Sequence, residues 1–203
     1  MSEYLFELTN HLASLAQHSE NAAFKQLAAT LSGLPQNRPT PGSSSCPTSE
    51  KSLDEAIQSL PDRLSISDVA EKAARLSPWA EASRGIPEFF AGGYAYSILV
   101  DEHGPAGPEP IRLGLLLQQS DVAYPGHAHD AEEFYFILSG EADWRIDDRE
   151  FRAAPGDLIH HPPAAIHAME TLERPLLAAW VWRGNLTGRF WYESAPDVDC
   201  PRS

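Results

Sequence analysis

The sequence predicts a mainly β protein, a small antiparallel barrel or jelly roll, with an α-helical extension at its N-terminus. Apolar residues in the first 85 positions recur at three- and four-residue steps, and from Gly85 onward short apolar stretches alternate with Gly, Pro and Asp. The chain has 203 residues, of which 42% are hydrophobic and 22% charged, as expected for one sizeable domain with an appendage. A packed core is therefore expected.

The N-terminal extension is predicted to contain several amphipathic helices. Residues 4–15 and 24–31 show the helical repeat of apolar positions. Ser52 and Glu55 have the spacing of a capping box, which predicts that a third helix begins at Ser52. A further helix is predicted over residues 68–76.

Short strands account for the rest of the chain. The predicted strands are 94–100, 111–118, 134–139, 142–146, 157–160, 166–171 and 176–182. Strands at this spacing favour an antiparallel barrel. The predicted organisation is a helical extension over residues 1–84, a barrel over 85–192 and a C-terminal tail over 193–203, with a flexible Pro- and Ser-rich loop at 35–50 in the extension.

Charge and composition exclude several classes of partner. The chain carries 29 acidic and 15 basic residues, a net charge of −14, which disfavours nucleic acid and anionic membrane surfaces. Its longest apolar run near a candidate span, residues 176–182, is far shorter than a membrane helix. The first residues lack the features of an export signal, so a cytoplasmic location is expected. The two cysteines, Cys46 and Cys200, predict neither a disulfide framework nor a thiolate zinc site.

The segment GHAHDAEEFYFILSG contains the pattern of a metal site. His127 and His129 have the same parity in an extended chain, so both imidazoles project to one side with Cα atoms roughly 6.6 Å apart. One ion can bind both rings at ~2.0–2.1 Å. If the chain turns at residues 130–131 and resumes pairing, Glu133 and Tyr135 return to this inner face, while the even-numbered residues after Glu133 pack on the opposite face.

His167, farther along the chain, offers the predicted fourth ligand. The two prolines ahead of it restrict its freedom in the folded chain, which would lower the entropic cost of closing the site. The donor set His127, His129, Glu133 and His167 suits a divalent transition metal, with Zn, Fe, Mn, Ni and Co all compatible. The other histidines are interpreted as loop, structural or solvated residues; they are His11, His18, His103, His160 and His161.

These residues resemble the two motifs of the cupin superfamily. The first motif, G(x)5HxH(x)3-4E(x)6G, is matched from His127 to Gly140, although its leading glycine stands nearer, at Gly126. The second, G(x)5PxG(x)2H(x)3N, aligns with Gly156 through His167. Ala164 stands in place of its turn glycine and residue 171 is threonine in place of asparagine. The resemblance implies a double-stranded β-helix, or jelly-roll, barrel. Neither departure falls on a metal ligand, and the one at Ala164 affects only the tight turn.

A narrower resemblance is to the small cupin-type dimethylsulfoniopropionate lyases of the Q type. The residues that carry it, in chain order and behind a helical extension, are Tyr124, His129, Glu133, Tyr135, His167 and Trp182. It implies a metal-dependent carbon–sulfur lyase that cleaves a zwitterionic substrate by β-elimination to acrylate and dimethyl sulfide. A metal would bind the substrate carboxylate and stabilise the charge that develops when the α-proton leaves.

The resemblance also implies roles for the aromatic residues. Tyr135 would be the general base, since a nearby dication favours the phenolate. Tyr124 would orient the substrate carboxylate or serve as the base itself. The diffuse cationic sulfonium is best surrounded by aromatic faces, which fits Trp182 by resemblance and Trp180 by its shared parity.

Two other functions are compatible with the same residues. Three histidines and a glutamate with free coordination positions also suit the ferrous iron of a cupin dioxygenase. A non-catalytic cupin that binds a small metabolite is the second alternative, and in such a protein Tyr135 would be dispensable. In each case the expected partner is a small molecule, and the sequence does not predict an oligomeric state.

Overall fold

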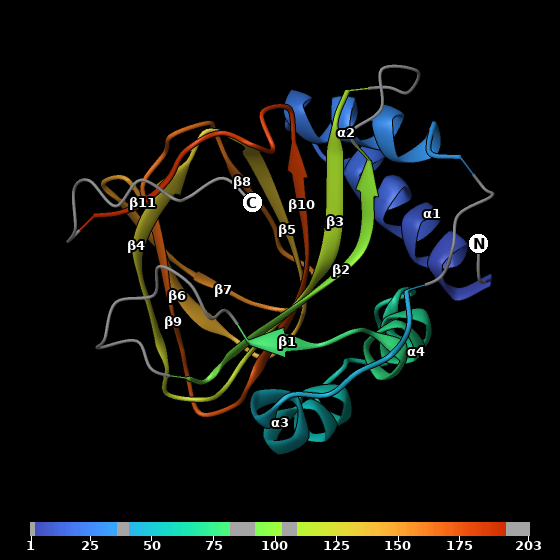
Figure 1. Ribbon diagram of the computed structural model, residues 1–203, viewed down its shortest axis with the longest axis vertical. Helices are drawn as coiled ribbons and strands as arrows, with labels where there is room; N and C mark the ends of the chain where they lie inside the picture. The colour runs from blue at the N-terminus through green and yellow to red at the C-terminus, as the bar shows by residue number, and fades with distance from the viewer. Residues whose placement is uncertain (1–2, 36–40, 82–91, 103–108, 194–203) are drawn as a thin grey trace.

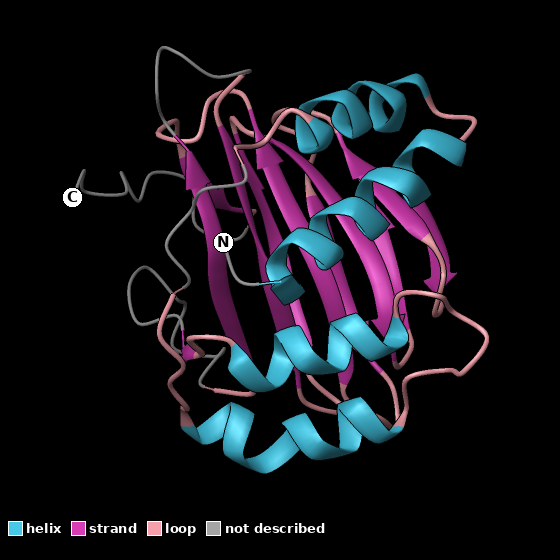
Figure 2. Ribbon diagram, turned by 90° about the vertical axis from the view of Figure 1, so that its right-hand side faces the viewer, coloured by secondary structure: helices cyan, strands magenta, loops and turns pink. Residues whose placement is uncertain are grey.

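Two antiparallel sheets face each other around a barrel, and the helices lie outside it against one sheet (Figures 1 and 2). This arrangement comes from a computed structural model, which describes residues 3–35, 41–81, 92–102 and 109–193. It confirms the predicted fold class, a mainly β barrel of two antiparallel sheets with an N-terminal helical extension.

The larger sheet has the strand order β1-β2-β3-β10-β5-β8. Its strands are β1 (Ala80–Glu81), β2 (Tyr94–Glu102), β3 (Ile111–Gln118), β10 (Leu176–Arg183), β5 (Glu132–Ser139) and β8 (Leu158–His161). The smaller sheet has the order β11-β4-β9-β6-β7. Its strands are β11 (Phe190–Tyr192), β4 (Ala123–His129), β9 (His167–Thr171), β6 (Ala142–Ile146) and β7 (Arg149–Ala153).

All seven predicted strands are present, each within two residues of the predicted limits. The strands β1, β4, β7 and β11 were not predicted. β4 contains Pro125 and Gly126, which interrupt the usual strand pattern, and β7 is largely exposed and carries charged residues, so it lacks apolar alternation.

The helical extension consists of α1 (Glu3–His18), α2 (Ala22–Ser32), α3 (Pro47–Gln58) and α4 (Ser67–Leu76). The prediction that the third helix begins at Ser52 was wrong, because α3 starts five residues earlier. Cys46 is the residue before the helix, and its backbone N–H donates to the hydroxyl of Ser49 at 2.9 Å. Pro47 occupies the first helical position, where its missing N–H costs nothing.

The six-stranded sheet is buried on both faces, which separates two apolar cores. On its outer face, Phe134, Phe136 and other strand residues pack against apolar residues of the helices, which cover this face (Figure 2). On its inner face, Tyr135 and Ile137 pack inside the barrel with Trp144 of the other sheet. The predicted division of β5 into an inner odd-numbered face and an outer even-numbered face is therefore confirmed.

The turn between β8 and β9 forms although it lacks the glycine of the cupin motif. Ala164 adopts the left-handed backbone conformation, with φ of 65°. Its N–H donates to the carbonyl oxygen of His129 at 2.8 Å, and the N–H of Ala165 donates to the carbonyl of Pro162 at 3.1 Å. The first bond joins the turn that precedes His167 to the end of β4, and the second closes the turn itself.

Replacing Ala164 by glycine is expected to stabilise the fold. The left-handed conformation costs an alanine about 1–2 kcal/mol, which glycine would not lose. The greater freedom of glycine in the unfolded chain offsets about 0.4–1 kcal/mol of that gain. We expect a net gain of about 0.5–1 kcal/mol in the free energy of unfolding, measured by denaturant titration. Ala165→Gly is the control and should lose stability. A lower stability for A164G would contradict the strain inferred at this turn.

Several predictions lie wholly or partly outside the described residues. The boundary at 84/85, His103, Cys200 and residues 194–203 are among them, so the domain limits stay predictions. Cys46 is buried and unbridged. None of the helices in the described ranges has the length and apolar character needed to cross a bilayer.

Candidate metal centre

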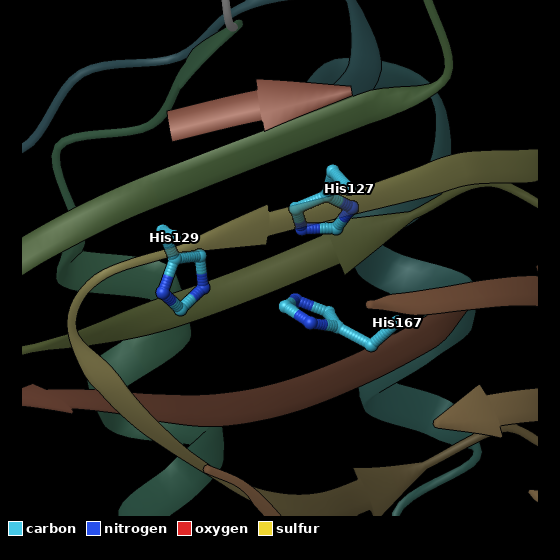
Figure 3. A group of neighbouring side chains, drawn as sticks. All are labelled: His127, His129 and His167. Atoms are coloured by element: carbon cyan, nitrogen blue, oxygen red, sulfur yellow. The ribbon is translucent and has the colours of Figure 1, made fainter. Parts of the chain in front are cut away.

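Three histidines of the smaller sheet converge inside the barrel. His127 and His129 lie on β4 and His167 on β9, and their rings face one another (Figure 3). The register of the two strands places His127 opposite His167, with ring centroids 4.1 Å apart. All three side chains are buried, and their candidate ligand atoms lie within 4.8 Å of one another.

Backbone carbonyls orient the three imidazoles. The Nδ1 atoms of His127, His129 and His167 each lie 2.9 Å from a carbonyl oxygen two residues away, at Pro125, Ala131 and Ala165 respectively. A carbonyl can only accept, so each Nδ1 carries the hydrogen and, in the neutral ring, each Nε2 presents a lone pair. Metal-binding histidines are commonly oriented in this way.

Glu133 reaches the same point from the larger sheet. The chain bends at Asp130 and Ala131 between β4 and β5, as predicted, so Glu133 enters the barrel interior near the start of β5. Its Oε2 lies 3.2 Å from the Nε2 of His129 and 3.2 Å from the Nε2 of His167. The carboxylate is buried.

The spacing of these donor atoms fits a metal ion. Donors that bind one ion tetrahedrally at 2.0–2.1 Å lie about 3.3–3.4 Å apart, close to the 3.2 Å between Glu133 Oε2 and each of the two imidazoles. The Nε2 of His167 is buried and makes no hydrogen bond within the described residues. Lone pairs that face a buried carboxylate repel one another unless a cation lies among them. This His/Glu group could therefore bind a metal.

His161 belongs to the same cluster. It lies on β8 directly opposite Glu133 on β5, is fully buried, and its Nδ1 is 2.9 Å from Glu133 Oε2. Among the described residues, two groups of side chains could hold a metal: His127, His129 and His167 form one, and Glu133, His161 and His167 the other. The four predicted ligands are thus divided between two groups that share His167.

The electrostatics of the cluster follow from burial and from the neighbouring rings. Burial alone would raise the pKa of Glu133, but the nearby His129 imidazole, together with close contacts to His161 and His167, holds the pKa well below its usual value. Burial, and then the proximity of His167, lowers the pKa of the His127 imidazole. These groups therefore favour an anionic carboxylate beside a neutral His127.

Both predicted tyrosines lie inside the barrel. Tyr135 is buried two residues beyond Glu133, with its ring 5.1 Å from Trp144 and 5.5 Å from His161. Burial, and then the charge of Glu133, raises the pKa of the Tyr135 phenol. Tyr124 lies on β4 with its ring 4.5 Å from His127, and burial likewise raises the pKa of its phenol.

The two predicted tryptophans lie on the same strand, β10. Trp180 is paired with Tyr135 and Trp182 with Glu133 across the β10–β5 ladder. Trp182 Nε1–H donates to Glu133 Oε1 at 2.6 Å, and its ring lies 4.3 Å from that of His129. The sequence reasoning anticipated the aromatic face of Trp182 but not this hydrogen bond. The indole N–H of Trp180 is buried and donates no hydrogen bond to any part of the chain that the structure describes.

The sequence of residues 12–178 matches the dimethylsulfoniopropionate lyase family. The chain belongs to this family. It is 32% identical over 139 residues to dimethylsulfoniopropionate lyase DddQ of Ruegeria pomeroyi, an alignment that covers 67% of this chain and 66% of that protein. The chain is thus aligned with slightly less than two thirds of this curated relative.

Solved structures of lyases agree with this membership. The crystal structure of DddQ from Ruegeria pomeroyi superposes with a TM-score of 0.68 and 27% identity, covering 97% of this chain and all of that one. A structure from a study of the lyases RdDddP and RnDddQII gives a TM-score of 0.69 at 21% identity, covering 94% of this chain and 97% of that one. The second comparison shows the shared fold alone.

In this dimethylsulfoniopropionate lyase family member, one residue of the buried cluster was not predicted from the sequence. That residue is His161. In the sequence, His161 comes directly after the predicted strand 157–160 and precedes two prolines, which is typical of a loop. The structure places both residues, His160 and His161, on β8, with their side chains on opposite faces of the sheet. His160 stacks on Phe134 on the outer face and pairs with Glu132, whereas His161 faces inward. The signal that could have distinguished them is strand alternation: His161 is two residues from the inward-facing, apolar Ile159 and so shares its face, whereas His160 does not.

Proposed function

We propose that this lyase family member cleaves dimethylsulfoniopropionate by β-elimination into dimethyl sulfide and acrylate. The observation that carries the proposal is the convergence of His129, Glu133 and His167 at 3.2 Å spacing in a buried interior that also holds Tyr135. Family membership over residues 12–178 supports this substrate. A cytoplasmic location is part of the same proposal.

We assign the metal ligands as His127, His129, Glu133 and His167. Their imidazole and carboxylate donors suit a divalent transition metal, and Zn, Fe, Mn, Ni and Co are all compatible. Such an ion supplies Lewis-acid stabilisation of negative charge at the substrate carboxylate. The backbone carbonyls at Nδ1 hold the three rings in the required tautomer.

The elimination needs one base and no acid. Tyr135, as phenolate, takes the α-proton, the electron pair of that C–H bond forms the C=C bond of acrylate, and the C–S bond breaks to release neutral dimethyl sulfide. The phenol stays protonated in the metal-free protein because burial and Glu133 raise its pKa. A dication bound beside it acts in the opposite direction.

The remaining aromatic residues are assigned to the substrate. Tyr124, next to His127, would orient the carboxylate. Trp180 and Trp182, whose ring centroids are 5.9 Å apart, offer aromatic surface to the sulfonium. The N–H of Trp182 is already donated to Glu133, so only its ring faces remain for this contact.

Headspace gas chromatography tests the proposal directly. Purified protein mixed with dimethylsulfoniopropionate should release dimethyl sulfide and form acrylate in equal amounts, with the same yield in the presence and absence of dioxygen. Dimethylsulfonioacetate is a matched control because it has no β-carbon and cannot eliminate. Oxygen consumption with a diketone or thiol substrate, and no dimethyl sulfide, would instead favour the dioxygenase alternative. Absence of turnover with both would favour a non-catalytic binding protein.

A further inference from the structure

His161 is the member of the buried cluster that the proposed ligand set leaves out. Its side chain is fully buried, and both ring nitrogens have a side-chain partner. Nδ1 lies 2.9 Å from Glu133 Oε2, and the indole N–H of Trp144 donates to Nε2 at 3.0 Å. A residue with these contacts could in principle bind the metal, brace the carboxylate or only fill the core.

Trp144 decides between these roles. An indole N–H can only donate, so His161 Nε2 must present a lone pair to it. The hydrogen of the neutral ring is then on Nδ1, where it is donated to the carboxylate of Glu133. Both nitrogens are committed, and neither has a lone pair free for a metal.

We propose that His161, held in one tautomer by Trp144, is a positioning residue that orients Glu133 for metal binding and is not itself a ligand. The proposal rests on the metal-dependent function given above. Trp182 supports the same carboxylate from the other side, since it donates to Oε1 at 2.6 Å while His161 donates to Oε2. With these two donors in place, one lone pair of Oε2 remains for the ion, and it faces His129 and His167.

The sheet architecture explains how these groups come together. His161 on β8 and Trp182 on β10 are the direct cross-strand neighbours of Glu133 on β5, one on each side. Trp144 is supplied by β6 of the opposite sheet, so the contact crosses the barrel. The His161 ring also stacks on His167, with centroids 3.9 Å apart and an angle of 27° between planes. His161 therefore restrains two proposed ligands at once.

Zinc affinity of the full-length protein tests the proposal. After removal of bound metal, the Zn²⁺ dissociation constant is measured by competition with a chromophoric chelator. His161→Leu removes both hydrogen bonds and should weaken binding by about 10–100-fold. His161→Asn keeps an N–H donor near the position of Nδ1 and should stay within about threefold of the wild type. His160→Leu, the same change at the outward-facing neighbour, should leave the affinity unchanged.

His161→Leu could fail to fold, so a second variant and a count of the metal's imidazole ligands test the proposal independently of it. Trp144→Phe releases the tautomer of His161 and should weaken Zn²⁺ binding by at least about threefold. X-ray absorption of the zinc-loaded proteins should count the same number of imidazole ligands in the wild type and in His161→Asn.

Three results would overturn the proposal, and they point to different errors. Loss of one imidazole in His161→Asn would make His161 a ligand. Wild-type affinity in folded His161→Leu, or in Trp144→Phe if the leucine variant does not fold, would reduce His161 to a core residue. Failure of the wild-type protein itself to bind Zn²⁺, Fe²⁺, Mn²⁺, Ni²⁺ or Co²⁺ would remove the metal-dependent function and this inference with it.

Discussion

Tyr135→Phe is expected to lower kcat for dimethyl sulfide release by about 10²–10⁴-fold, the contribution typical of a general base. The substitution removes one oxygen atom from a side chain that is buried between Trp144 and His161. The ring contacts are retained, so the fold should be unchanged. Bound metal should also be retained, because the proposed ligands do not include the phenol.

Tyr124→Phe is the matched control for this prediction. It removes the same atom from another buried tyrosine, beside His127 rather than beside Glu133. We expect it to raise KM more than it lowers kcat, as a residue that orients the carboxylate should. Wild-type turnover in Tyr135→Phe would remove Tyr135 from the mechanism, and a large loss of kcat in Tyr124→Phe alone would transfer the role of base to Tyr124.

His129→Ala and His167→Ala are each expected to reduce bound metal to a small fraction of the wild-type stoichiometry and to abolish turnover. Each removes one of the two imidazoles that lie 3.2 Å from Glu133 Oε2. The loss of turnover has a second cause. When no cation is bound, burial and the charge of Glu133 keep the pKa of Tyr135 raised, so its phenol stays protonated. Elemental analysis of the purified variants and the headspace assay measure the two effects.

His18→Ala provides the control for metal content. His18 is an exposed residue at the end of α1, and its Nδ1 contacts only the backbone carbonyl of Ser14 among the contacts described. This variant should keep full metal and full activity. Full metal occupancy in both His129→Ala and His167→Ala would contradict the proposed ligand set.

Local patterns in the sequence were sufficient to predict most of the architecture. Alternation along 132–139 separates Tyr135 from Phe134 and Phe136, and the structure confirms that the two sets face different cores. The parity of His127 and His129 likewise predicts that they project to one side, and both side chains are buried and converge with His167 (Figure 3). These predictions succeed because a strand alternates its side chains regardless of what it pairs with.

The start of α3 shows where local signals compete. Ser52 and Glu55 have the capping-box spacing, but Pro47 and Ser49 form an earlier helix start that is joined to Cys46. Both starts are compatible with the local sequence. In the folded protein α3 packs against the larger sheet, and Ser52 is a buried residue inside the helix instead of its first residue.

By itself, the sequence determined the class of fold, the inner face of β5 and the residue types of the candidate metal site, because each depends on spacing within a single strand or helix. The tertiary structure alone decided which side chains meet across strands. The β5–β8 register brings His161 to Glu133, the β5–β10 register brings Trp182 to the same carboxylate, and closure of the barrel brings Trp144 to His161. A shift of one residue in either register would turn these side chains to the opposite face, and no pattern within one segment specifies which residue of another segment it will oppose.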